Sequence, residues 1–551
     1  MSSTQRRDEE HANAAHEPGA AAAATGRLSV FGQLITDRDR LLAHFRGTRT
    51  IEDLKPLLAL EDNYLAVYET ANEVWIVNSL YSLNPYFFAS GADSFLHGDT
   101  IAAVAAQGPV DLSWNHEAIA DFLGLEHLVG DETLARGVRP VPQGAILHWD
   151  GKRLSSRTFT FQEFLAPSDG PPHERLITLF LEGLQAGAGA RPIATCSSGL
   201  DSRVNLAGLL HLGLKPELCV MGDPNSKDVQ ITRAMAKAFD LRLNHVPLEP
   251  RDYVEGAERI CRLTNGVKAL HHWHTYLLAT KSGYSPSDPV ITGNNGEHVR
   301  AAGFDYGFIA KGMDALSRVD HGTLSGWALA KAWNRRTHML LRPEELAQCA
   351  REFVDDYCTA KQNRRLVGVM PDLPFVTKSD AFVLQQRRRG FQGCGLKLMS
   401  QGFFPYSAFT RKSWVDAGWG LGLDWKLGSR WHRYAVARLC PALLPFPEEK
   451  EATRMLSRPR PLVWAPVVNR MYRRPKPIPY VDNGAILQRT DVLDLLHGAG
   501  GELEGFMPKT VVEGIIDDHR RTRGRGRLIG ILTAMAVWRA SLREGRPIAG
   551  R

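Results

Sequence analysis

Cysteine is scarce in this chain, which has seven cysteines in 551 residues and no Cys-x-x-Cys pair. An odd number without paired spacing argues against a disulfide framework and a cysteine-based structural zinc site, so we expect free thiols in a reducing compartment. Long apolar runs are also missing, since no stretch approaches the roughly 18 residues of a spanning helix. The first 26 residues have no signal-peptide core. We therefore expect a cytoplasmic protein that has no membrane partner and begins with a disordered tail over residues 1–26.

Acidic residues are outnumbered, with 60 Asp and Glu against 67 Lys and Arg, and the formal net charge is +7. The excess is concentrated late in the chain. Residues 451–480 carry seven basic residues against one acid, and residues 501–551 carry ten against six. Such patches suit an anionic substrate, a phosphate group or a solvated surface. A nucleic-acid partner is the less favoured interpretation, also for the arginine-rich stretch 520–527.

The pattern of apolar residues changes once along the chain. Residues 28–161 contain short β-like segments, including a hairpin predicted over 144–154, and a stretch rich in Pro, Gly and Ser at 166–174 predicts a linker. After the linker, strand-like and helical segments alternate, with Ser226 as a predicted helix cap. The predicted strands of this part lie at 192–196, 217–222, 242–248 and 288–298. This alternation indicates a parallel sheet covered by helices, so the chain is predicted to be an α/β protein, α+β overall.

One short stretch carries most of the chemistry. The sequence SSGLDSR (197–203) stands where the first strand of the predicted parallel sheet turns into a helix. Such a loop offers unpaired backbone N–H groups and the positive end of a helix dipole, and Gly199 allows close approach of an anion. Hydroxyl donors are added by Ser197, Ser198 and Ser202. Asp201 would repel a phosphate unless a divalent cation lay between them, which makes it a candidate magnesium ligand. The plain alternative is a Ser-Gly turn with a capping aspartate.

The motif resembles the S-G-G-x-D-S pyrophosphate loop of ATP pyrophosphatases, and its surroundings resemble the asparagine synthetase family. The second strand and its turn, with Val220, Met221 and Gly222, match the segment that contacts adenine in that family. A helix beginning near Asp228 follows, and ITGNNGEH (291–298) matches the later G-x-G-x-(D)-E turn, with Glu297 as its glutamate. Two departures stand out. Ser198 replaces the first glycine. At the position of the acid that precedes the glutamate stands Gly296, or Glu297 itself if the register slips by one.

Upstream, residues 78–88 and 128–144 are similar in spacing to two segments of the family's N-terminal glutaminase domain. The nucleophilic cysteine of that domain has no counterpart, because the first cysteine is Cys196. Asn78 and Ser79 stand where the family has an Arg-Asp pair that holds glutamine. Ser2 is a remote alternative nucleophile, far from the first predicted strand. The resemblance thus implies a degenerate glutaminase domain that does not release ammonia.

The resemblance implies a degenerate Ntn-hydrolase-like domain over 27–165, an adenine nucleotide α-hydrolase-like (PP-loop ATP pyrophosphatase) domain over 175–470 and a basic helical extension over 471–551. It implies ATP and Mg²⁺ as cofactors, with pyrophosphate and magnesium at the 197–202 loop. Glu297 is the expected catalytic acid or metal-orienting residue. Lys450 is the expected catalytic lysine, with Lys397 as its competitor. Arg203 either reaches a phosphate or lies on the helix surface.

The expected activity is an ATP-dependent, AMP-forming carbon–nitrogen ligase. It would adenylate a substrate carboxylate and pass it to an amine, as in lasso peptide cyclases and β-lactam synthetases. The expected substrate is a small molecule or peptide that carries a carboxylate and an amine. A precursor peptide or a partner protein is a further candidate partner. Amidation of a small molecule or saccharide with free ammonia is an alternative, as are a catalytically silent nucleotide-binding relative and a tRNA-modifying pyrophosphatase. The HHWH stretch (271–274) either lines the acyl-substrate pocket or packs in the core. A metal pair of His271 and His274 lacks a third ligand.

Overall fold

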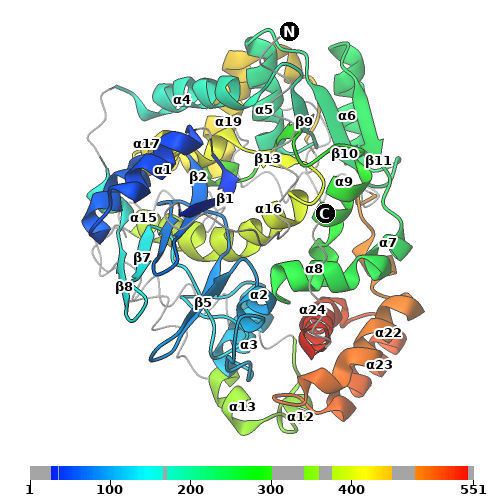
Figure 1. Cartoon of the computed structure of the whole chain (residues 1–551). Coiled ribbons are helices and arrows are strands. Elements are labelled where there is room, and N and C mark those ends of the chain that lie inside the picture. The colour runs from blue at the N-terminus through cyan, green and yellow to red at the C-terminus, as the bar shows by residue number, and fades with distance from the viewer. Residues whose placement is uncertain are drawn as a thin grey trace.

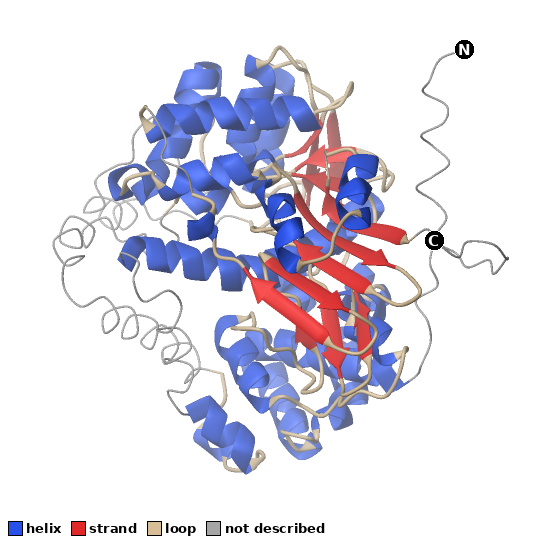
Figure 2. Ribbon diagram, turned by 60° about the vertical axis from the view of Figure 1, so that its left-hand side comes forward, coloured by secondary structure: helices blue, strands red, loops and turns tan. Residues whose placement is uncertain are grey.

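The computed structural model describes residues 26–34, 36–165, 170–300, 340–358, 375–448 and 478–543. It contains three β-sheets and many helices, and the first and last residues of the chain lie outside the described ranges (Figure 1). Figure 2 shows the strands gathered toward one side of the molecule, with most helices toward the other. The fold is therefore mixed α/β, as predicted. None of the helices in the described ranges combines the length and apolar character needed to cross a bilayer.

The N-terminal part is built on an antiparallel sheet in the order β1-β2-β3-β7-β8. The strands are β1 (Arg27–Gln33), β2 (Asn63–Glu69), β3 (Val74–Asn78), β7 (Ala145–Trp149) and β8 (Leu154–Thr158). A smaller antiparallel sheet has the order β5-β4-β6, with β4 (Phe87–Ser90), β5 (Phe95–Gly98) and β6 (Arg139–Pro140). The hairpin expected over 144–154 is confirmed as β7 and β8, and Gly151 takes a left-handed φ of 88° in its turn.

The described residues of this part form three α-helices, α1 (Arg38–Arg46), α2 (Ile101–Ala105) and α3 (His116–Leu125), and the 3₁₀ helices Ile51–Ala59 and Phe161–Glu163. Both faces of β2 and β3 are almost fully buried, because helical segments cover one face and the second sheet covers the other. The expected linker 166–174 is partly helical, since α4 (Pro172–Gly187) begins inside it. Proline at the first helical position explains this start, because its missing N–H is not needed there.

The predicted parallel sheet is present and has the order β11-β10-β9-β12-β13. Its strands are β9 (Ile193–Thr195), β10 (Glu217–Met221), β11 (Leu243–Val246), β12 (Pro289–Ile291) and β13 (Phe404–Tyr406). The connecting helices are α5 (Leu200–His211), α6 (Lys227–Ala238), α7 (Pro250–Glu255), α8 (Ala257–Thr264) and α9 (His274–Lys281). Ser226 caps α6 as predicted, accepting a hydrogen bond from the Val229 amide. Four of the five strands were expected, and β13 was not.

The later helices complete two hydrophobic cores. Around the parallel sheet lie α15 (Phe375–Phe382), a π-helix (Val383–Gln392), α16 (Gly393–Met399), α17 (Lys412–Trp419), α18 (Leu423–Lys426) and α19 (Arg430–Leu439). Beside the N-terminal part lie α12 (Pro343–Leu346), α13 (Arg351–Cys358), α21 (Asn483–Ile486), α22 (Thr490–Ala499), α23 (Lys509–Thr522) and α24 (Gly526–Arg543). In Figure 1, α24 lies among α8, α22 and α23, and twelve of its eighteen residues are buried. The predicted extension 471–551 thus shares a core with α3 and α8.

Candidate functional site

Two loops meet at the carboxyl edge of the parallel sheet. The serine loop (residues 197–202) follows β9 and opens α5, and the glycine turn (residues 293–297) follows β12. The two strands are parallel neighbours, whereas the next strand along the chain from β9 is β10 on its other side. Counted along the chain, the sheet has the order 3-2-1-4-5, so the strand order reverses between β9 and β12. Ligands of open α/β sheets bind in the crevice at such a switch point.

The serine loop is closed by its own hydroxyl groups. The Ser202 hydroxyl accepts a hydrogen bond from the Ser197 amide at 3.1 Å and lies 3.0 Å from the Ser197 hydroxyl. The Gly199 amide donates to Ser197 Oγ at 3.1 Å. Gly199 is exposed, and both serines are half-buried. Ser202 Oγ also lies 3.2 Å from the carbonyl oxygens of Ser197 and Gly199, so both hydroxyl groups are engaged within the loop. The amino-terminal amides of the twelve-residue helix α5 lie at the same point, which suits an anion that displaces some of these contacts.

Two other residues of the motif face the interior. Ser198 is fully buried, and both its amide and its hydroxyl donate to Asp228 Oδ1, at 2.7 and 2.6 Å. Its hydroxyl is therefore engaged with the first turn of α6 instead of the loop's open side. Arg203 is also fully buried and donates to the carbonyl oxygens of Phe446 and Pro447 at 2.8 and 2.6 Å. The helix-surface alternative for Arg203 is therefore wrong, and its contact with a phosphate stays a prediction.

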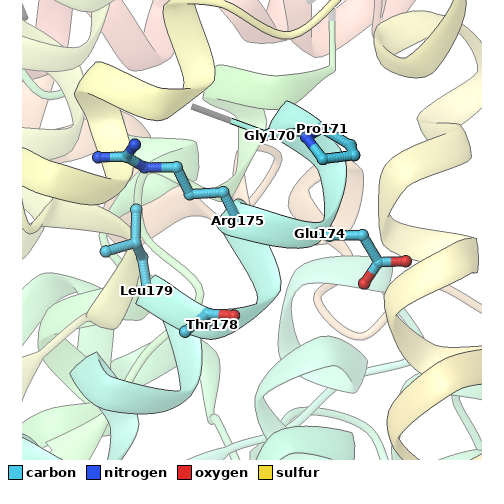
Figure 3. A pocket seen from close by; sticks show the side chains of 6 residues that line it. All are labelled: Gly170, Pro171, Glu174, Arg175, Thr178 and Leu179. Carbon is cyan, nitrogen blue, oxygen red and sulfur yellow. The ribbon is translucent and has the colours of Figure 1, made fainter. Parts of the chain in front are cut away.

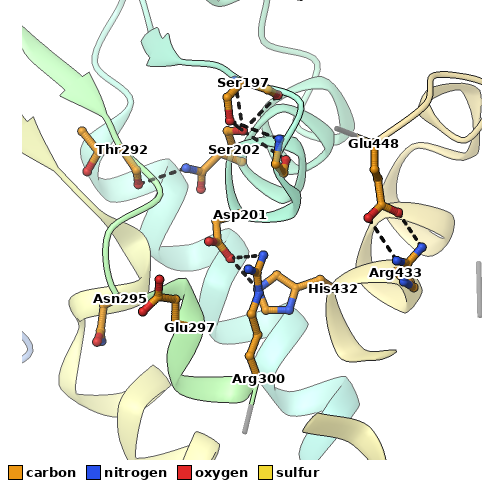
Figure 4. Close-up of polar contacts among 12 residues, drawn as sticks. Ser197, Asp201, Ser202, Thr292, Asn295, Glu297, Arg300, His432, Arg433 and Glu448 are labelled. Atoms are coloured by element: carbon orange, nitrogen blue, oxygen red, sulfur yellow. Dashed lines mark hydrogen bonds and ion pairs between the residues drawn. The ribbon is translucent and has the colours of Figure 1, made fainter. Parts of the chain in front are cut away.

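Asp201 is surrounded by positive charge (Figure 4). Its Oδ1 lies 2.8 Å from Arg300 Nη2 and 2.8 Å from Nε2 of the fully buried His432. Burial raises the pKa of Asp201, but the charge of Arg300, the contact with His432 and the charge of Arg388 together hold it below its usual value. Burial and the neighbouring Arg300 lower the pKa of His432, although Asp201 opposes them. The carboxylate is therefore ionised at neutral pH.

The glycine turn packs directly on Asp201. A Cβ at position 293 would lie 2.9 Å from Asp201 Cβ, and one at 296 would lie 2.6 Å from Asp201 Oδ1. This contact requires glycine at 296, because a side chain there would collide with the carboxylate. Asn295, in the left-handed region with φ of 72°, fixes the turn. Its amide nitrogen Nδ2 donates to Phe409 O at 2.6 Å, and its Oδ1 accepts from the buried Arg388 at 2.8 Å.

Glu297 lies on the same turn, below Asp201 in the view of Figure 4. Its Oε2 accepts from Gln392 Nε2 at 3.4 Å and lies 3.6 Å from Arg387 Nη1. Both partners come from the π-helix, and Gln392 also accepts from the Asn295 amide at 3.3 Å. The side chain of Glu297 is 31% exposed and that of Arg387 is 45% exposed. The Glu297 carboxylate and the Arg387 guanidinium are thus close together, and both are partly exposed.

The donors present fit a magnesium ion. Asp201 is ionised, its Oδ1 meets neither Arg300 nor His432 with hydrogen-bond geometry, and its side chain remains 21% exposed. The carboxylate of Glu297 stands on the adjacent turn. Magnesium is held by one or two carboxylates together with substrate phosphates, so Asp201 and Glu297 are the residues that would hold it. Arg300 is the competing cation on Asp201.

The predicted adenine-contacting residues lie at the end of β10. Val220 is buried. Met221 is half-buried and packs against a hydrophobic cluster that includes Cys219 and Val246. Gly222 has φ of 107°, its amide donates to Val246 O at 2.9 Å, and its carbonyl oxygen lies 2.8 Å from His245 Nε2. The carbonyl of Tyr480 covers it so closely that a Cβ at 222 would lie 2.2 Å from that oxygen. A base that binds at Gly222 must therefore share this place with the backbone of Tyr480.

The lysine predictions have different outcomes. Lys450 lies outside the described residues, and Glu448, held by Arg433 at 3.0 Å, is the last described residue before it. Lys397 lies away from the site, because its Nζ is 2.9 Å from Asp99 Oδ2 of the N-terminal part. Among the described residues, Arg387 is the cation beside Glu297, which the sequence analysis did not single out.

The residues that replace the glutamine-holding pair are structural. Asn78 is buried and its amide donates to the carbonyl oxygens of Val141 and Pro142 at 3.0 and 2.9 Å. Ser79 is buried and accepts from the Tyr64 amide at 3.1 Å. Both side chains are thus occupied in holding strands together. Ser2 lies outside the described residues.

An open surface pocket lies elsewhere, along the first turns of α4 (Figure 3). It is lined by Gly170, Pro171, Glu174, Arg175, Thr178 and Leu179. None of the predicted site residues lines it. Its only charged groups are one acid and one base on a single helix, so it offers no assembled chemistry.

No protein-family model matches the chain, and a search of curated proteins finds none that matches it. What the protein does has to be inferred from its own residues.

Proposed function

We propose that the chain is an ATP-dependent, AMP-forming carbon–nitrogen ligase without glutaminase activity. The observation that carries this proposal is the pairing of the serine loop with the glycine turn at the switch point of the parallel sheet. The strand order supports an adenine nucleotide α-hydrolase-like domain, and the antiparallel N-terminal sheets support a degenerate glutaminase-like domain. Within this proposal a substrate carboxylate attacks the α-phosphorus of ATP, pyrophosphate leaves, and an amine then displaces AMP.

The residues have separate tasks in this scheme. The hydroxyl groups of Ser197 and Ser202 and the first amides of α5 bind the leaving diphosphate. Magnesium, held by Asp201 and Glu297, would neutralise part of the phosphate charge. Arg387 supplies positive charge on the open side of the turn. Glu297 has one of two tasks: it holds magnesium together with Asp201, or, where Asp201 alone holds the ion, it accepts the proton of the attacking amine. Catalysis would rest on positioning and charge stabilisation more than on a covalent intermediate.

The nitrogen comes from an amine and not from glutamine. Asn78 and Ser79 are buried and hydrogen-bonded, which leaves no pair to hold the glutamine backbone. The substrate is then a small molecule or peptide with a carboxylate, and the amine stands on the same molecule in a cyclisation or on a second one in an amidation.

A second candidate is a silent nucleotide-binding relative. Two observations favour it: Arg300 occupies the cation position of Asp201, and the Tyr480 carbonyl covers Gly222. The two candidates differ in products. Incubation with ATP, Mg²⁺ and a panel of amino acids and short peptides, followed by ³¹P NMR, should give AMP and pyrophosphate for the ligase. Nucleotide binding without turnover over the whole panel supports the silent relative, and release of ADP and phosphate contradicts the ligase.

A further inference from the structure

A second polar cluster lies where the N-terminal part, the parallel-sheet part and α24 meet. Glu126 ends α3 in a left-handed conformation, with φ of 61°, and its carboxylate faces the 3₁₀ turn Leu270–His272. Its Oε1 lies 3.5 Å from His271 Nε2, and its Oε2 lies 3.2 Å from His272 Nε2. The three ligand atoms all lie within 4.8 Å of one another. The pair of His271 and His274, which the sequence did not favour, is not formed, since His274 Nε2 faces the Tyr480 hydroxyl at 3.5 Å.

One of these separations suits a shared metal ion as well as it suits a hydrogen bond. Two ligands about 2.0–2.1 Å from a tetrahedral ion stand roughly 3.3–3.4 Å apart, which is close to the 3.2 Å between Glu126 Oε2 and His272 Nε2. The contact of Oε1 with His271 at 3.5 Å is longer than the roughly 2.7–2.9 Å of a charge-assisted hydrogen bond, so His271 is free to turn toward an ion held at Oε2. We propose that Glu126, His271 and His272 form a binding site for a zinc ion, with a fourth position open to water or to a ligand group.

The surroundings of the cluster fit that assignment. Two histidines and one carboxylate are a donor set that zinc accepts when one coordination position stays open. Arg527 Nε contacts Glu126 Oε1, so the carboxylate would keep a supporting partner while Oε2 faces the ion. The side chains of His271, His272 and Glu126 are 14%, 26% and 19% exposed, so an ion can enter.

The cations that face the cluster are Arg527 and the buried Lys268, and they limit the affinity that the single carboxylate can provide. The ring of His272 packs edge-on against Phe391 at 4.7 Å, and the next residue, Gln392, contacts Glu297. The zinc site is thus connected to the glycine turn through Phe391 and Gln392. The zinc proposal does not depend on the proposed ligase activity.

The test uses the full chain without a histidine tag, stripped with a chelator and titrated with Zn²⁺ by calorimetry. Co²⁺ serves as a second probe, because its visible absorption is strong only in a site of low coordination number. The wild-type protein should bind about one Zn²⁺ per chain. His272→Gln and Glu126→Gln should weaken that binding by about 100-fold. The exposed His211 is the matched control, and His211→Gln should bind as the wild type does.

The alternative is that Glu126 is only an ion-pair partner of Arg527 and the histidines. In that case Zn²⁺ neither binds at one per chain nor raises the melting temperature, while Glu126→Gln still lowers it, and this result overturns the proposal. Equal binding by His272→Gln and wild type overturns it as well. If Glu126→Gln does not fold because Arg527 loses its partner, His271→Gln and His272→Gln together with the melting curves carry the same test.

Discussion

The backbone at Gly296 lies so close to the carboxylate of Asp201 that a side chain at position 296 would come within 2.6 Å of Oδ1. The serine loop and the glycine turn are thereby locked in one arrangement. Real Cβ atoms do not approach another heavy atom so closely, so any substitution at 296 must move Asp201 away from Arg300 and His432.

Gly296→Ala should therefore disturb the site directly. We expect a loss of about 1–3 kcal/mol of unfolding free energy from overpacking, and at least about tenfold weaker binding of ATP. Gly498→Ala is the matched control, because Gly498 is exposed in α22 with no atom within 4 Å of the added Cβ. It should gain up to about 1 kcal/mol from helix propensity. Urea denaturation and calorimetric titration measure both quantities, and equal ATP affinities in the two variants contradict the arrangement.

The three serines of the loop should separate into two classes. Ser198→Ala removes a buried hydrogen bond to Asp228 and should lower the unfolding free energy by about 1.5–3 kcal/mol with little effect on ATP affinity. Ser202→Ala removes the half-buried hydroxyl that closes the loop and should weaken ATP binding by about tenfold or more. A variant series measured by thermal melting and titration decides this. Loss of ATP binding in Ser198→Ala at unchanged stability would contradict the structural role assigned to Ser198.

These two serines also show how far the sequence could predict the site. The strand–loop–helix motif, the parallel sheet and the cap at Ser226 follow from local patterns, and the structure confirms them. The direction of a single side chain depends on what packs against it. The Ser198 side chain points inward because the carboxylate of Asp228, thirty positions later, accepts its hydrogen bond in the interior. No local sequence pattern indicates that pairing.

The missed elements have similar causes. The strand β13 consists of Phe404, Pro405 and Tyr406, and proline argues against a strand, but at the edge of this sheet it pairs with Val290. Arg300 and His432 reach Asp201 from distant parts of the chain. The arginine-rich stretch read as a solvated or anion-binding loop has inward members: Arg525 pairs with Glu345, and Arg527 pairs with Glu126. The sequence shows the glycine at 296, but it does not show that the Asp201 carboxylate packs against this position and leaves no room for a side chain.

The charge of Asp201 should make stability depend on pH. Its pKa is lowered in the folded state, so its ionised form stabilises the fold above the unfolded pKa near 4, and this contribution is lost as the pH falls below it. The difference in unfolding free energy between the wild type and Asp201→Asn should therefore be full at pH 7 and shrink below about pH 4. Denaturation at several pH values measures it. A difference that is the same at pH 7 and pH 3 contradicts the ion-pair account.

Two cations should differ in their effects on nucleotide binding. Arg387→Met removes the half-exposed charge beside Glu297 and should weaken ATP binding by about tenfold. Lys397→Met, whose partner is Asp99, should cost about 1 kcal/mol of stability at most from its ion pair and leave ATP affinity unchanged. Titration of both variants with ATP checks this. The reverse order of the two effects would assign the site's cation to Lys397.

The most direct measurement is a crystal structure of the chain with Mg²⁺ and an ATP analogue whose α,β-bridging oxygen is replaced by methylene. The account predicts the β- and γ-phosphates at the amino-terminal end of α5, within hydrogen-bond distance of Ser197 and Ser202, with the base on the β10 side. A triphosphate bound elsewhere, or no binding with Asp201 still paired to Arg300, would contradict it.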